Sequence, residues 1–126
     1  MDAVSAIVLL GGVTMFEADD FAKDPYGYAT NQAGHACIIG IPAGLVLLPF
    51  IGPYAAPVVV ALVYGGLWEV VIQRGKLWRD SIEDTAHVMA GASIICGATV
   101  SYWTVAGCVA AWLALIAIGF TRRWKL

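Results

Sequence analysis

Two long segments of the chain are almost free of charged side chains. Residues 33–72 contain a single Asp, Glu, Lys or Arg, which is Glu69, and residues 85–121 contain none. A helix needs about 20 predominantly apolar residues to cross the hydrocarbon core of a bilayer. Helices also satisfy their own backbone hydrogen bonds in lipid. The two segments therefore predict an all-α integral membrane protein, folded as a helical bundle.

The composition excludes several other classes of protein. The 126 residues are 60% hydrophobic and 13% charged, whereas soluble domains average about 45–50% apolar and roughly 25% charged residues. A chain of this length has too much surface to hide so many apolar residues in a water-soluble globule. Seven Lys and Arg residues and a net charge of −2 leave no basic surface for nucleic acid. We therefore exclude a soluble enzyme, a disordered tail and a nucleic-acid module, and we treat residues 1–126 as one transmembrane domain.

Five apolar stretches predict how the helices are arranged. Four transmembrane helices are expected, at about residues 33–49, 54–72, 85–101 and 104–120. The remaining stretch, residues 3–16, would reach only about 21 Å as a helix. We expect a short N-terminal hydrophobic helix there, and whether it crosses the bilayer stays open. Turns are predicted by the Asp-Pro-Tyr-Gly run at residues 24–27 and by the Phe-Ile-Gly-Pro run at residues 50–53.

The seven basic side chains predict the orientation in the membrane. If each of the four stretches crosses once, these side chains all lie on one side, and the loops on the opposite side carry no charge. By the positive-inside rule the charged side is cytoplasmic. The sequence therefore predicts a multi-pass protein of the bacterial cytoplasmic (inner) membrane, with its charged loops and C-terminus in the cytoplasm.

Polar side chains converge at this charged side. The predicted topology brings six of them to one level: His35, Glu69, Gln73, Asp80, Asp84 and His87. Glu69 is the most informative, because an ionisable group inside an apolar run usually faces a partner or a wet cavity. Asp84 and His87 share one face of a helix. A shared polar site is therefore expected at the charged side.

Simpler explanations compete for the same residues. The segment 81–84 is typical of a helix start, with residue 81 as the N-cap. On this interpretation Asp80 and Glu83 serve for capping or solvation. For Asp84 both roles stay open, helix capping and membership of the polar site. Each histidine is also explained as a hydrogen-bonded anchor at the membrane surface. Two His and two carboxylates suit a divalent cation, but the spacing matches no metal-binding motif. We expect no metal and no cofactor.

Small residues predict where the helices pack. Glycine at a helix contact allows two backbones to approach closely. The pair at residues 65–66 lies one turn before Glu69 and would let a neighbouring helix come near it. The predicted packing residues are Gly40, Gly44, Gly65, Gly66 and Gly91.

The spacing of the polar residues resembles that of a known family. The residues that match are, in chain order, Asn31, His35, Glu69, Gln73, Arg74, Gly75, Asp84, Gly91 and Ala92. They are similar to motifs of the VanZ-like family of small multi-pass membrane proteins, and the match covers roughly residues 31–92. Two positions depart from the family pattern: the Gln follows its Glu by four residues instead of three, and Val88 stands where the family has Asn.

Two functions follow as hypotheses. The family is associated with glycopeptide tolerance at the cell envelope, so the resemblance implies an envelope protein with a polar cytoplasmic-side site for a lipid-linked or anionic headgroup. The residues expected to form that site are His35, Glu69, Asp84, His87, Asn31 and Gln73. The alternative is an accessory or assembly subunit of a larger membrane complex. The expected partners are membrane lipids, with either a larger membrane complex or further copies of the chain, and no nucleic acid. Whether the protein is an enzyme stays open.

Overall fold

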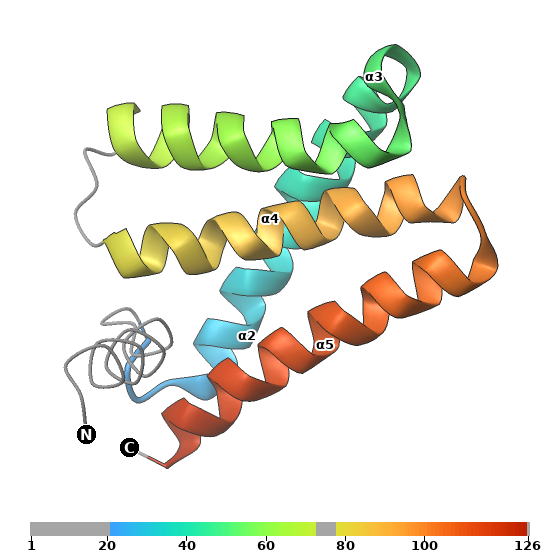
Figure 1. Ribbon diagram of the computed structural model, residues 1–126. Helices are drawn as coiled ribbons and strands as arrows, with labels where there is room; N and C mark the ends of the chain where they lie inside the picture. Colours follow the sequence, from blue (N-terminus) through green and yellow to red (C-terminus); the bar gives the residue numbers. More distant parts are fainter. Residues whose placement is uncertain (1–20, 73–77, 126) are drawn as a thin grey trace, which may run out of the picture.

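The computed structural model describes residues 21–72 and 78–125, without the side chains of residues 69, 70, 72, 78 and 79. This part of the chain contains three helical runs (Figure 1). The first run consists of α2 (Pro25–Gly34), a π-helical segment η1 (His35–Gly40), α3 (Ile41–Leu62) and a second π-helical segment η2 (Val63–Ile72). The second is α4 (Trp78–Ala98) and the third is α5 (Tyr102–Trp124). The predicted all-α class is confirmed for these residues.

The first run folds back on itself inside α3. Gly52 has a φ of 81° and a ψ of 171°, a conformation that glycine adopts without the strain a Cβ would bring. The helix is kinked at this residue, and Figure 1 shows the chain doubling back there. Pro49, Pro53 and Pro57 lie on both sides of the kink and supply no backbone N–H to the helix. The turn predicted at residues 50–53 is confirmed, and it is centred on Gly52.

The first run begins earlier than predicted. The side chain of Asp24 accepts a hydrogen bond from the backbone nitrogen of Gly27 at 2.8 Å, so Asp24 is the N-cap of α2. Pro25 follows at the first helical position, where its missing N–H costs nothing. The prediction of a turn at residues 24–27 is therefore wrong, because the Asp-Pro pair starts a helix. Helix α2 has ten residues, and some of its buried side chains belong to the candidate functional site.

The prediction of four transmembrane helices plus a short N-terminal helix is wrong. Among the described residues two segments are long and apolar enough to cross a membrane, Pro25–Trp68 and Tyr102–Trp124. The spans predicted at residues 33–49 and 54–72 belong to one helical run. Helix α4 is not one of these segments, and its first two turns carry four charged residues. Residues 3–16 lie outside the described part of the chain.

Helix α4 lies between α3 and α5 (Figure 1) and packs against both. It crosses the first run where Gly40 and Gly91 bring the backbones together, since a Cβ on either glycine would collide with the backbone of the opposite helix. Gly44 and Gly65 also face α4 side chains, whereas a Cβ on Gly66 would meet no atom within 4 Å. Backbone contact at this crossing fixes the position of α4.

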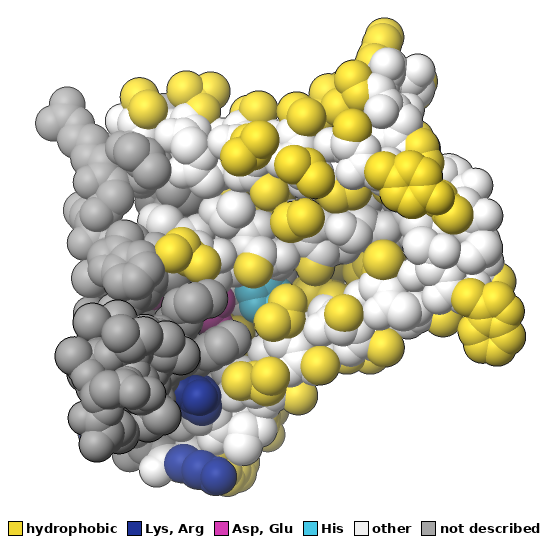
Figure 2. Space-filling view, viewed as in Figure 1, with side chains coloured by type: hydrophobic (Ala, Val, Ile, Leu, Met, Phe, Trp, Pro, Cys, Tyr) yellow, Lys and Arg dark blue, Asp and Glu magenta, His cyan; other side chains and the backbone are white. Residues whose placement is uncertain are grey.

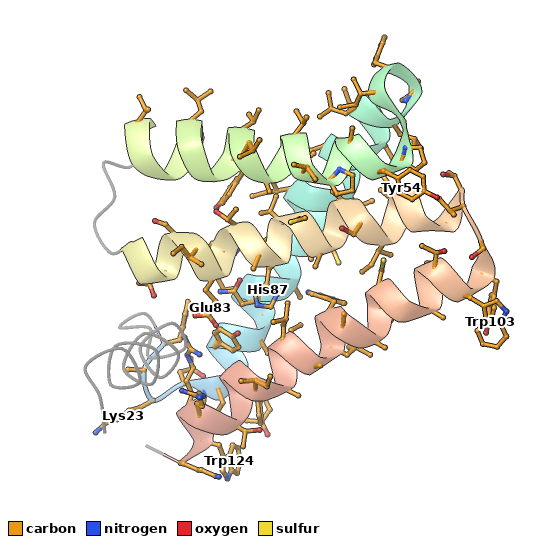
Figure 3. All side chains as sticks on the ribbon, in the orientation of Figure 1. Lys23, Tyr54, Glu83, His87, Trp103 and Trp124 are labelled. Carbon is orange, nitrogen blue, oxygen red and sulfur yellow. The ribbon has the colours of Figure 1, made fainter. Side chains whose placement is uncertain are left out.

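The two ends of the bundle differ in chemistry. Figure 3 shows Lys23 and Trp124 at one end, which we call the charged end, and Tyr54 and Trp103 at the other. In Figure 2 the dark-blue basic side chains lie at the charged end, and hydrophobic side chains are distributed along the helices over the rest of the described face. The basic and the apolar surfaces are therefore separated along the helices.

Candidate functional site

Four buried polar side chains meet at the charged end, where α2, α4 and α5 come together. They are Tyr28 from α2, Glu83 and His87 from α4, and Arg123 from α5, and each is 5% exposed or less. Burying a charge costs free energy unless it is paired and hydrogen-bonded. Figure 3 shows Glu83 and His87 on the face of α4 that looks toward α5. We call these four residues the ion-pair cluster.

Glu83 is the acceptor at the centre of the ion-pair cluster. The hydroxyl of Tyr28 donates to Oε1 of Glu83 at 2.5 Å, and Nη2 of Arg123 lies 3.6 Å from Oε2. The guanidinium also lies over the Tyr28 ring, 3.7 Å from its centroid, and Nη1 donates to the carbonyl oxygen of Gly119 at 3.2 Å. Arg123 thus has a carboxylate, an aromatic face and a backbone acceptor.

Trp112 determines which nitrogen of His87 carries the proton. The indole Nε1–H can only donate a hydrogen bond, and it lies 3.2 Å from Nδ1 of His87. Nδ1 therefore accepts, and the ring proton resides on Nε2. Nε2 lies 3.3 Å from the hydroxyl oxygen of Tyr28 and donates to it. A one-way chain of donors runs from Trp112 through His87 and Tyr28 to the carboxylate of Glu83.

Burial changes the acid–base behaviour of the two α4 residues, which lie outside both candidate membrane-spanning segments. Burial lowers the pKa of His87 to about 4, and the positive charges of His35 and Arg123 act in the same direction. Burial raises the pKa of Glu83, while the hydrogen bond from Tyr28 and the charge of Arg123 oppose that rise. His87 is therefore neutral near pH 7, in agreement with the tautomer that Trp112 selects.

A second polar group lies beside the ion-pair cluster, because Asp84 follows Glu83 in α4. Gln32 donates from Nε2 to Oδ1 of Asp84 at 2.8 Å, and Nδ1 of His35 lies 3.5 Å from the same oxygen. Oε1 of Gln32 is buried and has no hydrogen-bond partner among the described residues. We call Gln32, His35 and Asp84 the Asp84 site. It combines a carboxylate with an unused acceptor.

A small cavity borders both groups. Its volume is about 10 Å³, which accommodates about one water-sized group. Its polar walls are formed by Tyr28, Asn31, Gln32, Asp80, Asp84 and Arg123. Anything that enters this cavity therefore meets mainly carboxylate and amide groups.

The first helical run doubles back at Gly52, and an apolar groove of about 690 Å³ lies between its two halves and α4. Its walls include Ile39, Ala43, Val60 and Tyr64. The ring of Tyr64 also packs edge-to-face against the ring of His35, with 6.0 Å between the centroids. One wall of the apolar groove therefore touches the Asp84 site.

The structure brings together part of the predicted polar site. The predicted residues that lie in or beside the two polar groups are Asn31, His35, Asp84 and His87. Glu69 belongs to η2, and its side chain lies outside the description; Gln73 lies outside the described residues. In the described part of the chain, no three His, Cys, Asp or Glu side chains are placed to hold a metal ion.

Sequence reasoning missed several members of the site. The residues that the sequence did not predict as members of the site are Tyr28, Gln32, Trp112 and Arg123. The assignment of Glu83 to capping or solvation is wrong, because α4 begins at Trp78 and places Glu83 in its second turn, facing the bundle. Spacing offered one signal, since Glu83 and His87 are four residues apart and share a helix face.

The resemblance to the VanZ-like family stays a prediction. In comparisons with known proteins, no family model matches the chain, and no curated protein or solved structure matches it either. The function is therefore inferred from the site itself.

Proposed function

We propose that this chain is a small multi-pass protein of the bacterial cytoplasmic membrane that binds the headgroup of a lipid or lipid-linked molecule at the Asp84 site. The observation that carries the proposal is Oε1 of Gln32, which is buried beside the Asp84 carboxylate without a hydrogen-bond partner among the described residues. A buried acceptor that stays unpaired costs about 1–3 kcal/mol. A ligand that supplies the donor recovers this free energy.

The surface of the bundle supports a location in the membrane. Only 17% of the apolar window in Pro25–Trp68 and 6% of that in Tyr102–Trp124 is buried, whereas a core helix of a soluble protein is mostly buried. Ile38, Phe50 and Trp103 are 75%, 80% and 81% exposed. Exposed apolar side chains of this size are favourable against lipid and unfavourable against water.

The charged end faces the cytoplasm in this proposal. Its basic side chains include Lys23 and Lys125, and the positive-inside rule places such residues on the cytoplasmic side. Tyr26, Phe120 and Trp124 form an aromatic cluster at the same end, with centroid distances of 5.4, 6.1 and 5.8 Å. Aromatic rings are enriched at the level of the headgroups. The Asp84 site then lies near the cytoplasmic leaflet.

Lipid retention by the purified protein tests the proposal. Wild type, Asp84→Asn and Asp24→Asn are extracted from bacterial membranes in mild detergent, and bound lipids are measured by native mass spectrometry. Asp84→Asn keeps the shape of the side chain and removes its charge. Asp24→Asn is the matched control, because Asp24 is exposed and Asn caps a helix as well as Asp does.

We expect wild type and Asp24→Asn to retain a lipid that Asp84→Asn loses at least tenfold. Equal retention by all three proteins would contradict the proposal. The proposal would also be contradicted if wild type carried no lipid and migrated as a stoichiometric complex with another protein. That result would favour the accessory-subunit function.

A further inference from the structure

The floor and the rim of the apolar groove differ in burial. The floor belongs to the buried core of the bundle and includes Val60, Tyr64 and Val88. The rim is open, since Val46 and Val63 are 65% and 53% exposed. An empty groove of about 690 Å³ forfeits the dispersion contacts that its walls would make with a filling group. An occupant that matches the groove restores these contacts.

The lining of the groove favours a hydrocarbon occupant. Every described lining residue except Val88 belongs to Pro25–Trp68, a candidate membrane-spanning segment. None of the described lining residues is charged, and their polar side-chain atoms are the hydroxyl of Tyr64 and the indole nitrogen of Trp68. A buried water molecule typically makes about three hydrogen bonds, which these walls do not offer. Hydrocarbon therefore suits the groove better than water or a polar ligand.

A helix of a second copy or of another membrane protein is the competing occupant. Contacts between membrane helices are enriched in small residues, because these let two backbones approach closely. Ala43 is the only small side chain among the described lining residues. Gly40 and Gly91 are already used at the crossing of the first run with α4. The walls are therefore better suited to a flexible hydrocarbon chain than to a helix.

The length of the groove matches one leaflet of a bilayer. In the half of the first run that precedes Gly52, the described lining extends from Ile39 to Leu47. This separation corresponds to about 12 Å at 1.5 Å per residue. One leaflet supplies half of the hydrocarbon core, which is about 15 Å. A single acyl chain that lies along the helices would therefore fill the groove.

The groove is continuous with the Asp84 site. The ring of Tyr64 in its floor packs against the ring of His35, with 6.0 Å between the centroids. Nδ1 of His35 lies 3.5 Å from Oδ1 of Asp84. A lipid can therefore contact the Asp84 site with its headgroup while one of its chains enters the groove.

We infer that the apolar groove binds one acyl chain of a membrane lipid, namely the lipid whose headgroup occupies the Asp84 site. This inference rests on the proposed function and adds the chemical class of the ligand, a lipid with a fatty acyl chain about as long as one leaflet. The chain lies against the core of the bundle. The headgroup holds it there, which distinguishes this lipid from those that exchange freely around the protein.

Photo-crosslinking locates the acyl chain. The full chain in mild detergent receives one equivalent of phosphatidylethanolamine or phosphatidylglycerol with a diazirine in the middle of one acyl chain, and peptide mass spectrometry maps the label after irradiation. Val63 on the rim and Leu113 on α5 are both 53% exposed, so non-specific labelling reaches them equally. We expect at least one of the two lipids to label the segment around Val63 at least fivefold more than the segment around Leu113.

The groove is also tested by obstructing it. Val63→Trp places a large ring at the rim, and Leu113→Trp is the matched control because the two positions are equally exposed. We expect Val63→Trp to reduce labelling of Val60 and Tyr64 at least fivefold and Leu113→Trp to leave it within twofold. Circular dichroism checks that the helices are retained. The labelling of wild type keeps the test decisive if Val63→Trp does not fold.

The outcomes separate this inference from the proposed function. Equal labelling around Val63 and Leu113, with lipid retention that still depends on Asp84, would overturn the groove inference and leave the proposed function standing. Groove labelling that is unchanged in Asp84→Asn would contradict the proposed function and leave the groove as an acyl-chain site. A dimer that Val63→Trp converts to a monomer, without label in the groove of wild type, would assign the groove to a second copy and overturn the inference.

Discussion

The buried pair of Glu83 and Arg123 predicts a strongly non-additive double-mutant cycle. The two residues are 5% and 3% exposed, and removing one partner of a buried pair costs about 3–5 kcal/mol, because the other charge stays buried without compensation. We expect this cost for Glu83→Leu, which leaves the guanidinium with only the Tyr28 ring and a backbone carbonyl. We expect it equally for Arg123→Met, which leaves Glu83 with the hydrogen bond from Tyr28.

The double variant removes both charges together. Replacing a whole buried ion pair by apolar residues is often close to neutral, and the Tyr28 hydroxyl still accepts from His87. We therefore expect Glu83→Leu combined with Arg123→Met to lose no more than about 2 kcal/mol. The double variant should then be more stable than the sum of the single effects by at least about 4 kcal/mol.

Unfolding in mixed micelles measures this cycle. A denaturing detergent is titrated into each purified variant, and the free energy of unfolding is obtained from tryptophan fluorescence, to which Trp112 beside His87 contributes. Lys125→Met is the control at the same end of α5, because Lys125 is exposed and its replacement should change stability by less than about 0.5 kcal/mol. Single effects that add within about 0.5 kcal/mol would refute a stabilising contact between the two charges.

Two further predictions use the same titration. Gly91→Ala places a methyl group against the carbonyl of Ala36, so we expect the free energy of unfolding to fall by about 1–3 kcal/mol. In Gly107→Ala the new Cβ meets nothing within 4 Å, so the free energy of unfolding should rise by up to about 1 kcal/mol. A rise for both variants would contradict the backbone contact at the crossing. Because burial lowers the pKa of His87, the neutral ring stabilises the fold fully above its unfolded pKa of about 6.5. This stabilisation is lost as the pH falls toward about 4. At pH 5 the free energy of unfolding of wild type should be lower by about 2 kcal/mol than near neutral pH, and His87→Phe should not show this decrease. Parallel pH profiles of stability for the two proteins would show that the ring is not buried in its neutral form.

The helical class and the polar end could be predicted, but the number of spanning helices could not. The apolar segments indicate helices because they lack charge over lengths that suit a bilayer. Hydropathy alone treats residues 85–101 as an independent span, although the helix begins at Trp78 and includes the charged residues before that stretch. The Asp-Pro pair at residues 24–25 is typical of both a turn and a helix start, and its surroundings decide between them.

The members of the site differ in how visible they are in the sequence. His35 and Asp84 were predicted because each opens an apolar segment at the charged side, and the structure places them 3.5 Å apart. Arg123 could not be recognised, because a basic residue near the end of an apolar helix is already explained as a cytoplasmic anchor. Its burial against Tyr28 depends on packing between α2 and α5. The membership of Arg123 in the site therefore depends on contacts between helices that are distant in sequence, and local sequence patterns do not reveal such contacts.

The dependence of lipid retention on Asp84 tests the central claim most directly, which is that a headgroup binds at the Asp84 site. The purified full chain and its Asp84→Asn variant are compared by native mass spectrometry. The account predicts that wild type retains a lipid that Asp84→Asn loses at least tenfold. Equal retention by the two proteins would contradict the binding of a headgroup at this carboxylate.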